Sequence, residues 1–140
     1  MCLLYLIRHG ATPNNEAHPP RLQGRRVDAG LSAQGRRQAW HTARWLAGQG
    51  LDAVYASPLL RARQTAEEIA KLQGLAVELV DDLMEVDVGR WEGLTWEKIE
   101  KDYPEAYRLF MTDASVHPYL DGENLTAVQA RTIPAMARLT

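Results

Sequence analysis

An arginine and a histidine, Arg8 and His9, follow a short apolar run near the start of the chain. The run "LLYLI" over Leu3–Ile7 predicts a short buried strand, and a glycine comes directly after His9. Imidazole can act as a covalent nucleophile as well as a base. An arginine beside it would bind the oxygens of a phosphoryl group and would disfavour the imidazolium form. These residue types favour phosphoryl chemistry if further groups converge on His9.

The rest of the first half predicts the elements that would bring such groups together. Ser32 is a candidate N-cap of an amphipathic helix that ends near residues 48–50, and a second strand is expected over Leu51–Ala56. Ser57 and Pro58 would start a helix that Gly74 closes, before a third strand over Leu75–Val80. The alternation predicts an α/β fold with a parallel sheet and helical crossovers.

The carboxyl ends of parallel strands meet at one edge of a sheet, where ligands bind. Arg8 and His9 follow the first strand, Arg61 lies in the first helical turn after the second, and Glu85 follows the third. Two arginines could stabilise the charge of a transferring phosphoryl group, so no metal is required. A carboxylic acid such as Glu85 could protonate the leaving oxygen. The long connection over residues 10–31 is expected to be functional.

Composition limits the class of protein. The 140 residues are enough for one domain, with 46% hydrophobic and 24% charged residues and a net charge of -2. That charge argues against a general nucleic-acid binder, and no apolar stretch is long enough to predict a membrane span. Cys2 is the single cysteine, which excludes an intramolecular disulfide and fits the reducing cytoplasm.

The second half is expected to be more helical. Thr95 can cap a helix that Pro104 stops, and Pro104 can start the next one. A loop is expected over 114–122, and Asn124 can cap a last helix. The four tryptophans of the chain are expected to be packing anchors.

Five motifs in order extend over essentially the whole chain: "LIRHGAT", "RLQGRRVDAGLSAQG", "ASPLLRARQTA", "LMEVDVGRWEGLTW" and "DGENLTAVQAR". As a set they resemble the histidine phosphatase superfamily, in the branch that contains cofactor-dependent phosphoglycerate mutase and small phosphatases. The resemblance implies a three-layer sandwich, with a mostly parallel central sheet and helices on both faces.

The resemblance also implies roles for single residues. His9 matches the histidine that becomes phosphorylated, and Arg8 and Arg61 match the two arginines of the phosphate pocket. Asn15 matches the asparagine that follows this motif and should also touch phosphate, with Thr12 beside it.

Three further positions match residues that act on the leaving group or the substrate. Glu85 matches the proton donor, and Gln23 and Gly24 lie where a flexible loop lends contacts to substrate. Glu92 is expected to serve packing and capping.

One element of the family pattern has no match. The family pocket has a second histidine in an (S/T)-H-G motif, and none of His18, His41 and His117 is followed by glycine. We expect residues 1–140 to be a single histidine phosphatase domain, as an N-terminal fragment that lacks the strand with this histidine. The alternative is a natural short form.

The leading hypothesis is a cytoplasmic phosphomonoester hydrolase of the small phosphatase type. It would act without metal or other cofactor, through a phosphohistidine, on a small phosphorylated metabolite. Nucleic acid and membranes are not expected partners, and a homodimer is left open. The alternatives are a phosphoglycerate-type mutase and an inactive module that binds a phosphorylated ligand.

Overall fold

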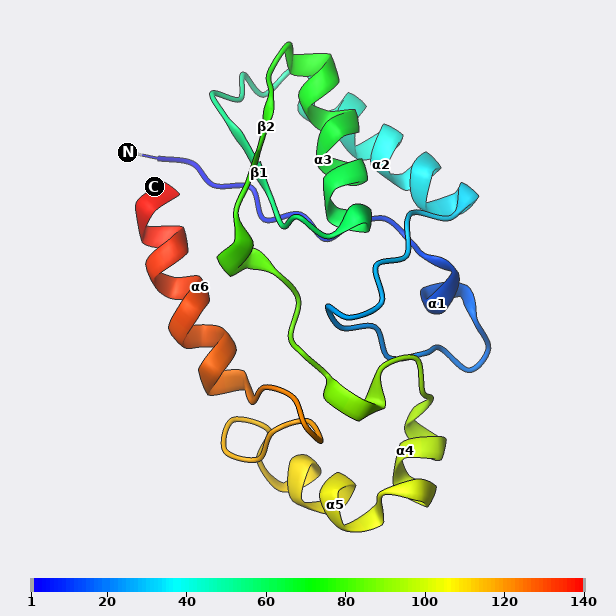
Figure 1. Ribbon diagram of the computed structural model, residues 1–140. Coiled ribbons are helices and arrows are strands. Elements are labelled where there is room, and N and C mark those ends of the chain that lie inside the picture. Colours follow the sequence, from blue (N-terminus) through cyan, green and yellow to red (C-terminus); the bar gives the residue numbers. More distant parts are fainter. Residues whose placement is uncertain (1, 140) are drawn as a thin grey trace.

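Strands β1 (Val54–Ala56) and β2 (Val77–Leu79) form a parallel sheet in the computed structural model, which describes residues 2–139. Val54 lies opposite Val77 and Ala56 opposite Leu79. Helix α3 (Leu60–Gln73) connects the two strands, and α2 (Ala33–Leu46) packs against it (Figure 1). This strand–helix–strand unit agrees with the α/β class predicted from the sequence.

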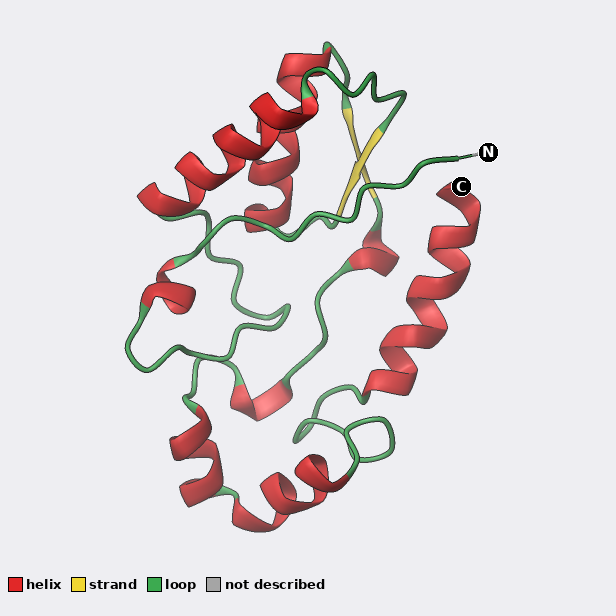
Figure 2. Cartoon of the chain, turned by 180° about the vertical axis from the view of Figure 1, so that it is seen from behind, coloured by secondary structure: helices red, strands yellow, loops and turns green. Residues whose placement is uncertain are grey.

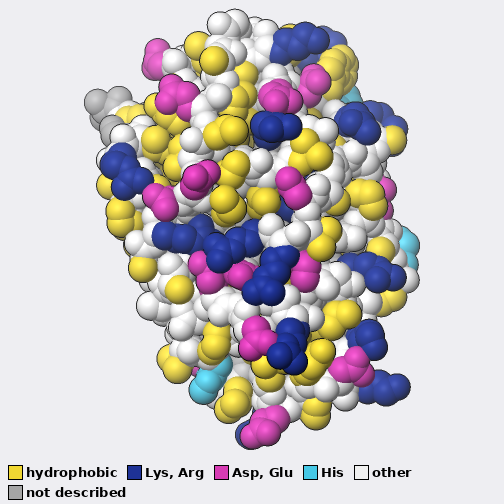
Figure 3. Space-filling view, in the orientation of Figure 1, with side chains coloured by type: hydrophobic (Ala, Val, Ile, Leu, Met, Phe, Trp, Pro, Cys, Tyr) yellow, Lys and Arg dark blue, Asp and Glu magenta, His cyan; other side chains and the backbone are white. Residues whose placement is uncertain are grey.

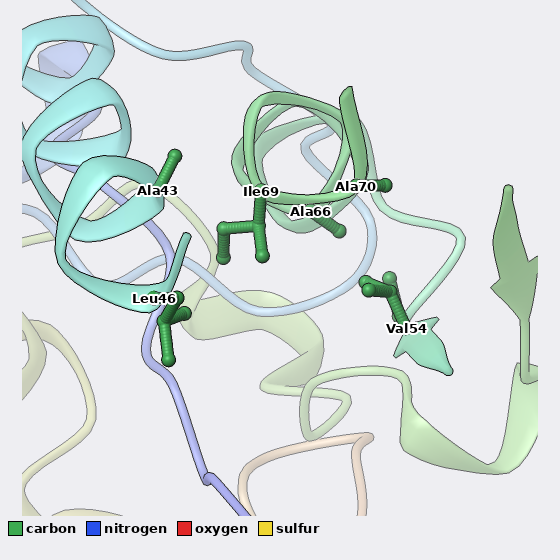
Figure 4. Packing of buried hydrophobic residues seen from close by; sticks show 7 residues of the cluster. Ala43, Leu46, Val54, Ala66, Ile69 and Ala70 are labelled. Carbon is green, nitrogen blue, oxygen red and sulfur yellow. The ribbon is translucent and has the colours of Figure 1, made fainter. Parts of the chain in front are cut away.

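The helices and strands of this unit share one hydrophobic cluster. Small residues on α2 and α3 let the two helices approach closely, and larger ones fill the space above the sheet (Figure 4). The buried members are Ala43, Leu46, Val54, Ala56, Ala66, Ile69 and Ala70. The cluster holds α3 in place, and α3 carries Arg61 in its first turn.

The prediction of a strand over Leu3–Ile7 is wrong. The segment is extended, but it forms no ladder with β1 or β2, and the sheet of the described residues has only these two strands (Figure 2). A strand exists through hydrogen bonds to a neighbour, which an apolar run alone does not provide. Leu3 and Leu6 are 76% and 78% exposed, whereas Tyr5 packs edge-on against Trp45.

The ends of the first two long helices follow the predicted signals in part. The Ser32 side chain accepts a hydrogen bond from the Gly35 N–H, and Gly74 closes α3 in the left-handed region with a φ of 69°. Helix α3 begins at Leu60, two residues after Pro58. Its first N–H, that of Leu60, donates to the Asp28 carboxylate at 2.6 Å, so a distant loop caps this helix.

The described residues of the second half form two 3-10 turns and three helices around a second core. These are the 3-10 turns η1 (Asp81–Leu83) and η2 (Gly89–Trp91) and the helices α4 (Trp96–Asp102), α5 (Pro104–Thr112) and α6 (Leu125–Leu139). Thr95 and Asn124 accept hydrogen bonds from the first turns of α4 and α6, as predicted. No helix within residues 2–139 is long and apolar enough to cross a membrane.

Trp91 is the centre of the second core. Its indole is fully buried and packs edge-on against Phe110 and Tyr119, with ring centroids 5.3 and 5.7 Å away. The prediction of a packing anchor is therefore confirmed for Trp91. Trp45 differs, because 63% of it is exposed.

Replacing Leu46 by alanine should test the first core. Leu46 is fully buried at the end of α2, so Leu46→Ala should lower the free energy of unfolding by about 2–5 kcal/mol. Leu72→Ala is the matched control, because Leu72 lies on α3 with 48% exposure and should cost less than about 0.5 kcal/mol. Urea denaturation of both variants measures the difference. Equal losses in the free energy of unfolding would contradict the burial of Leu46 in this core.

Candidate active site

His9 is held on both ring nitrogens. Its Nδ1 lies 2.7 Å from the Gly10 carbonyl oxygen and must carry the proton there, which leaves the lone pair on Nε2. Arg61 donates its Nε–H to this Nε2 over 3.2 Å. The Gly10 N–H in turn donates to the Thr65 hydroxyl at 3.1 Å, one turn after Arg61 on α3. The imidazole therefore presents an unprotonated nitrogen next to a guanidinium.

The surroundings of His9 keep its imidazole neutral. Burial is the largest cause and lowers the pKa of His9 below its usual 6.5, and the charges of Arg61 and Arg8 lower it further. The hydrogen bond to Gly10 and the charge of Glu85 oppose this shift without reversing it. The arginines act in the direction that the sequence predicts, but burial acts more strongly.

Arg61 is a buried cation with fixed partners. Only 1% of the residue is exposed, and its Nη2 donates to the Gly24 carbonyl at 2.9 Å. Its Nη1 lies 3.5 Å from the Val27 carbonyl oxygen. These carbonyls come from the connection between α1 (Pro13–Glu16) and α2, and they orient the Nε edge of the guanidinium toward His9.

A cavity of about 430 Å³ opens beside His9. The residues predicted from the sequence that line it are Arg8, His9, Asn15, Gln23 and Glu85. Thr12, Gly24 and Arg61 are buried and do not line it. The structure thus divides the predicted site residues into a cavity wall and a supporting layer.

The Thr12 hydroxyl connects two amide side chains of the cavity wall. Thr12 is fully buried, and its Oγ1 lies 2.7 Å from Gln23 Oε1 and 3.0 Å from Asn15 Oδ1. The Thr12 N–H also donates to Asn15 Oδ1. Because both amide oxygens are occupied, the amide NH₂ groups are left to donate, and the buried Gln23 Nε2 has no partner within the described residues. Such donors suit an anion.

Residues 4–140 of the chain match the histidine phosphatase superfamily (branch 1). The chain belongs to this superfamily. Phosphoserine phosphatase 1 of Hydrogenobacter thermophilus is 36% identical over 131 residues, which cover 94% of this chain and 61% of that protein. Glucosyl-3-phosphoglycerate phosphatase of Mycobacterium tuberculosis is 36% identical over 136 residues, with 97% and 59% covered.

Solved structures of histidine phosphatases show the same fold. The alpha-ribazole phosphatase of Shigella flexneri superposes with a TM-score of 0.86 at 28% identity, over 95% of this chain and 64% of that one. The native mycobacterial glucosyl-3-phosphoglycerate phosphatase gives 0.81 at 35% identity, over 94% and 60%. The chain therefore spans less than two thirds of the length of these relatives.

Six further residues of the chain line the cavity and were not predicted as site residues. They are Pro19, Pro20, Arg21, Leu22, Trp96 and Glu97. The first four directly precede Gln23 in the sequence, so the prediction that Gln23 contacts the substrate could have been extended to these neighbours. Trp96 and Glu97 come from the first turn of α4, and no local pattern connects this helix with His9.

Glu85 reaches the cavity from the segment that connects η1 and η2. Its Oε1 accepts a hydrogen bond from the Val86 N–H at 2.9 Å, and its side chain is exposed to the cavity. Within residues 2–139 no three His, Cys, Asp or Glu side chains are placed to hold a metal ion. The charged groups that act on the pKa of His9 are two arginines, Arg61 and Arg8, and one carboxylate, Glu85.

The pKa of His9 should lie below 6.5 in the folded protein, and Arg8→Gln should raise it while leaving it below that value, because burial remains. NMR titration of the imidazole measures both values, with His9→Gln to assign the signal. Between the lowered pKa and 6.5 the unfolded chain binds more protons at His9 than the folded one, so His9 makes stability rise with pH there. A folded-state pKa at or above 6.5 would contradict the burial of the ring.

Proposed function

We propose that this chain carries the phosphoryl-transfer site of a phosphomonoester hydrolase that acts through a phosphohistidine at His9. The observation that carries the proposal is the contact of the unprotonated His9 Nε2 with Arg61, at the wall of a cavity that Arg8 also lines. A neutral nucleophile with two arginines near it suits the transfer of a dianionic phosphoryl group, because the guanidinium groups can stabilise its charge.

The first step forms one bond and breaks another. His9 Nε2 attacks the phosphorus, the bond from phosphorus to the ester oxygen breaks, and the leaving oxygen takes a proton from the carboxyl group of Glu85. The Arg61 Nε–H then donates to a phosphoryl oxygen instead of to Nε2. Arg8 and the amides of Asn15 and Gln23 supply further donors from the cavity wall.

The second step returns the site to its starting state. Water attacks the phosphorus, its proton passes to the Glu85 carboxylate, and the bond from phosphorus to Nε2 breaks to release inorganic phosphate. Because Nδ1 stays bonded to the Gly10 carbonyl, the same tautomer of His9 is restored.

We propose a small phosphorylated metabolite as the substrate, since two relatives are named for phosphoserine and glucosyl-3-phosphoglycerate. That residues 1–140 form a single domain of this family also stays a proposal. None of His18, His41 and His117 lines the cavity. That the second pocket histidine of the family lies outside residues 1–140 stays a prediction. We also propose that the reaction needs no metal and takes place in the cytoplasm.

His9 should become labelled when the full natural chain reacts briefly with a ³²P-labelled phosphomonoester. The label should be acid-labile and stable to base, and His9→Ala should abolish it, because the bond is a phosphoramidate on the ring nitrogen. His41→Ala is the matched control and should label normally, since His41 is exposed on α2. Label on a serine or an aspartate would refute the mechanism, and transfer of the label to a sugar acid rather than to water would indicate a mutase.

Glu85→Gln should reduce kcat/KM on the order of 10²–10⁴ for an alkyl phosphate. An alkoxide is a strongly basic leaving group that needs the proton, whereas p-nitrophenolate is stable as an anion, so the loss on p-nitrophenyl phosphate should be much smaller. Both substrates are measured in the full natural chain. Equal losses on the two substrates would mean that Glu85 binds the substrate or supports the structure of the site, and that another group donates the proton.

A further inference from the structure

Glu92 holds the loop that supplies the partners of Arg61. Its carboxylate accepts hydrogen bonds from two backbone N–H groups, that of Gly24 to Oε1 at 2.6 Å and that of Arg26 to Oε2 at 3.2 Å. Both oxygens of one carboxylate are therefore used on a single loop. Glu92 does not line the cavity, and packing and capping were all that the sequence predicted for it.

Gly24 connects Glu92 with Arg61, because it is hydrogen-bonded to both. Its N–H bonds to Glu92, while its carbonyl oxygen accepts from Arg61 Nη2 at 2.9 Å. The backbone at Gly24 is closely packed, since a Cβ there would lie 2.6 Å from the Val86 carbonyl oxygen and 2.8 Å from Val88 Cγ2. A continuous series of hydrogen bonds thus connects Glu92, the loop, the Arg61 guanidinium and His9 Nε2.

We infer that Glu92 is a positioning residue for phosphoryl transfer, which sets Arg61 against His9 through the loop over residues 24–26. The inference rests on the proposed function, in which Arg61 stabilises the transferring group. Because the Glu92 carboxylate accepts from the N–H groups on both sides of Arg25, it fixes the backbone path that carries the Gly24 carbonyl to Arg61. Glu92 touches neither the cavity nor His9, and it acts only through these intermediates.

Glu92→Gln separates positioning from a simple effect of charge. The amide keeps the size of the side chain, but its NH₂ end faces a backbone N–H and cannot accept from it. Removal of a negative charge alone would lower the pKa of His9 and tighten anion binding. Displacement of Arg61 from His9 would do the opposite, because the ring loses a neighbouring cation and the anion loses a donor.

The experiment uses the full natural chain and measures three quantities by NMR. They are the pKa of the His9 imidazole, the chemical shift of the Arg61 Nε–H and the dissociation constant of inorganic phosphate. In E92Q the pKa of His9 should rise, the Arg61 resonance should move and phosphate should bind on the order of tenfold more weakly. E92D keeps the charge but is too short to reach both N–H groups, and it should lie between E92Q and the wild type.

E100Q is the control, because Glu100 is exposed on α4 and the substitution makes the same change in charge. E100Q should leave the pKa of His9, the Arg61 resonance and the affinity for phosphate unchanged. A lower melting temperature of E92Q with wild-type pKa and phosphate affinity would overturn the inference, and so would a lowered pKa of His9 with tighter phosphate binding. If E92Q fails to fold, wild-type values in E92D overturn it. If the wild type binds no phosphate but the His9 and Arg61 signals still respond to E92Q, the positioning stands and the proposed function fails.

Discussion

The hydrogen bond from Arg61 to His9 is the contact on which the arrangement of the site depends. A buried guanidinium is costly unless it is hydrogen-bonded, and the loop carbonyls of Gly24 and Val27 each accept from one of its two Nη atoms. The Nε–H is directed at the one ring nitrogen of His9 that has a free lone pair. Burial of this pair also lowers the pKa of His9, so the same packing makes the nucleophile neutral and brings the cation to it.

The site as a whole needs two parts of the chain to be fixed to one another. Arg61 belongs to the unit of α2, α3 and the sheet, whereas Glu85 and Trp96 belong to the second half. Ion pairs join the connecting loop to that half: Arg26 pairs with Asp87 at 2.6 Å, and Arg25 pairs with Glu123 at 3.7 Å. Within the second half, Glu123 also pairs with Arg131 of α6 at 3.2 Å. Basic and acidic side chains lie next to one another over the face in Figure 3.

These ion pairs also support the proposed proton donor. Arg131 donates from Nη2 to the carbonyl oxygen of Glu85 at 3.2 Å, so α6 helps to hold the backbone at this residue. Burial is the largest single influence and opposes ionisation of Asp87 and Glu123. The hydrogen bonds from Arg26 and Arg131, those from backbone N–H groups and the charges of the neighbouring arginines together outweigh it and lower the pKa of each carboxyl. The network therefore stabilises the fold at neutral pH and weakens as the pH falls through the lowered pKa values.

The sequence alone determined the features that depend on neighbours along the chain. The Ser32 cap and the Gly74 stop are contacts within a few residues, and the motifs around His9, Arg61 and Glu85 are contiguous. Tertiary structure decided what depends on distant partners. Leu3–Ile7 has the composition of a strand but no ladder with β1 or β2, and α3 starts at Leu60 because Asp28 caps it. The hydrogen bond from the Gly24 N–H to Glu92 joins residues far apart in the chain, and no local pattern encodes it. Propensity and spacing act over a turn of helix or a few strand residues, whereas a hydrogen bond between distant segments exists only once packing has brought both ends together.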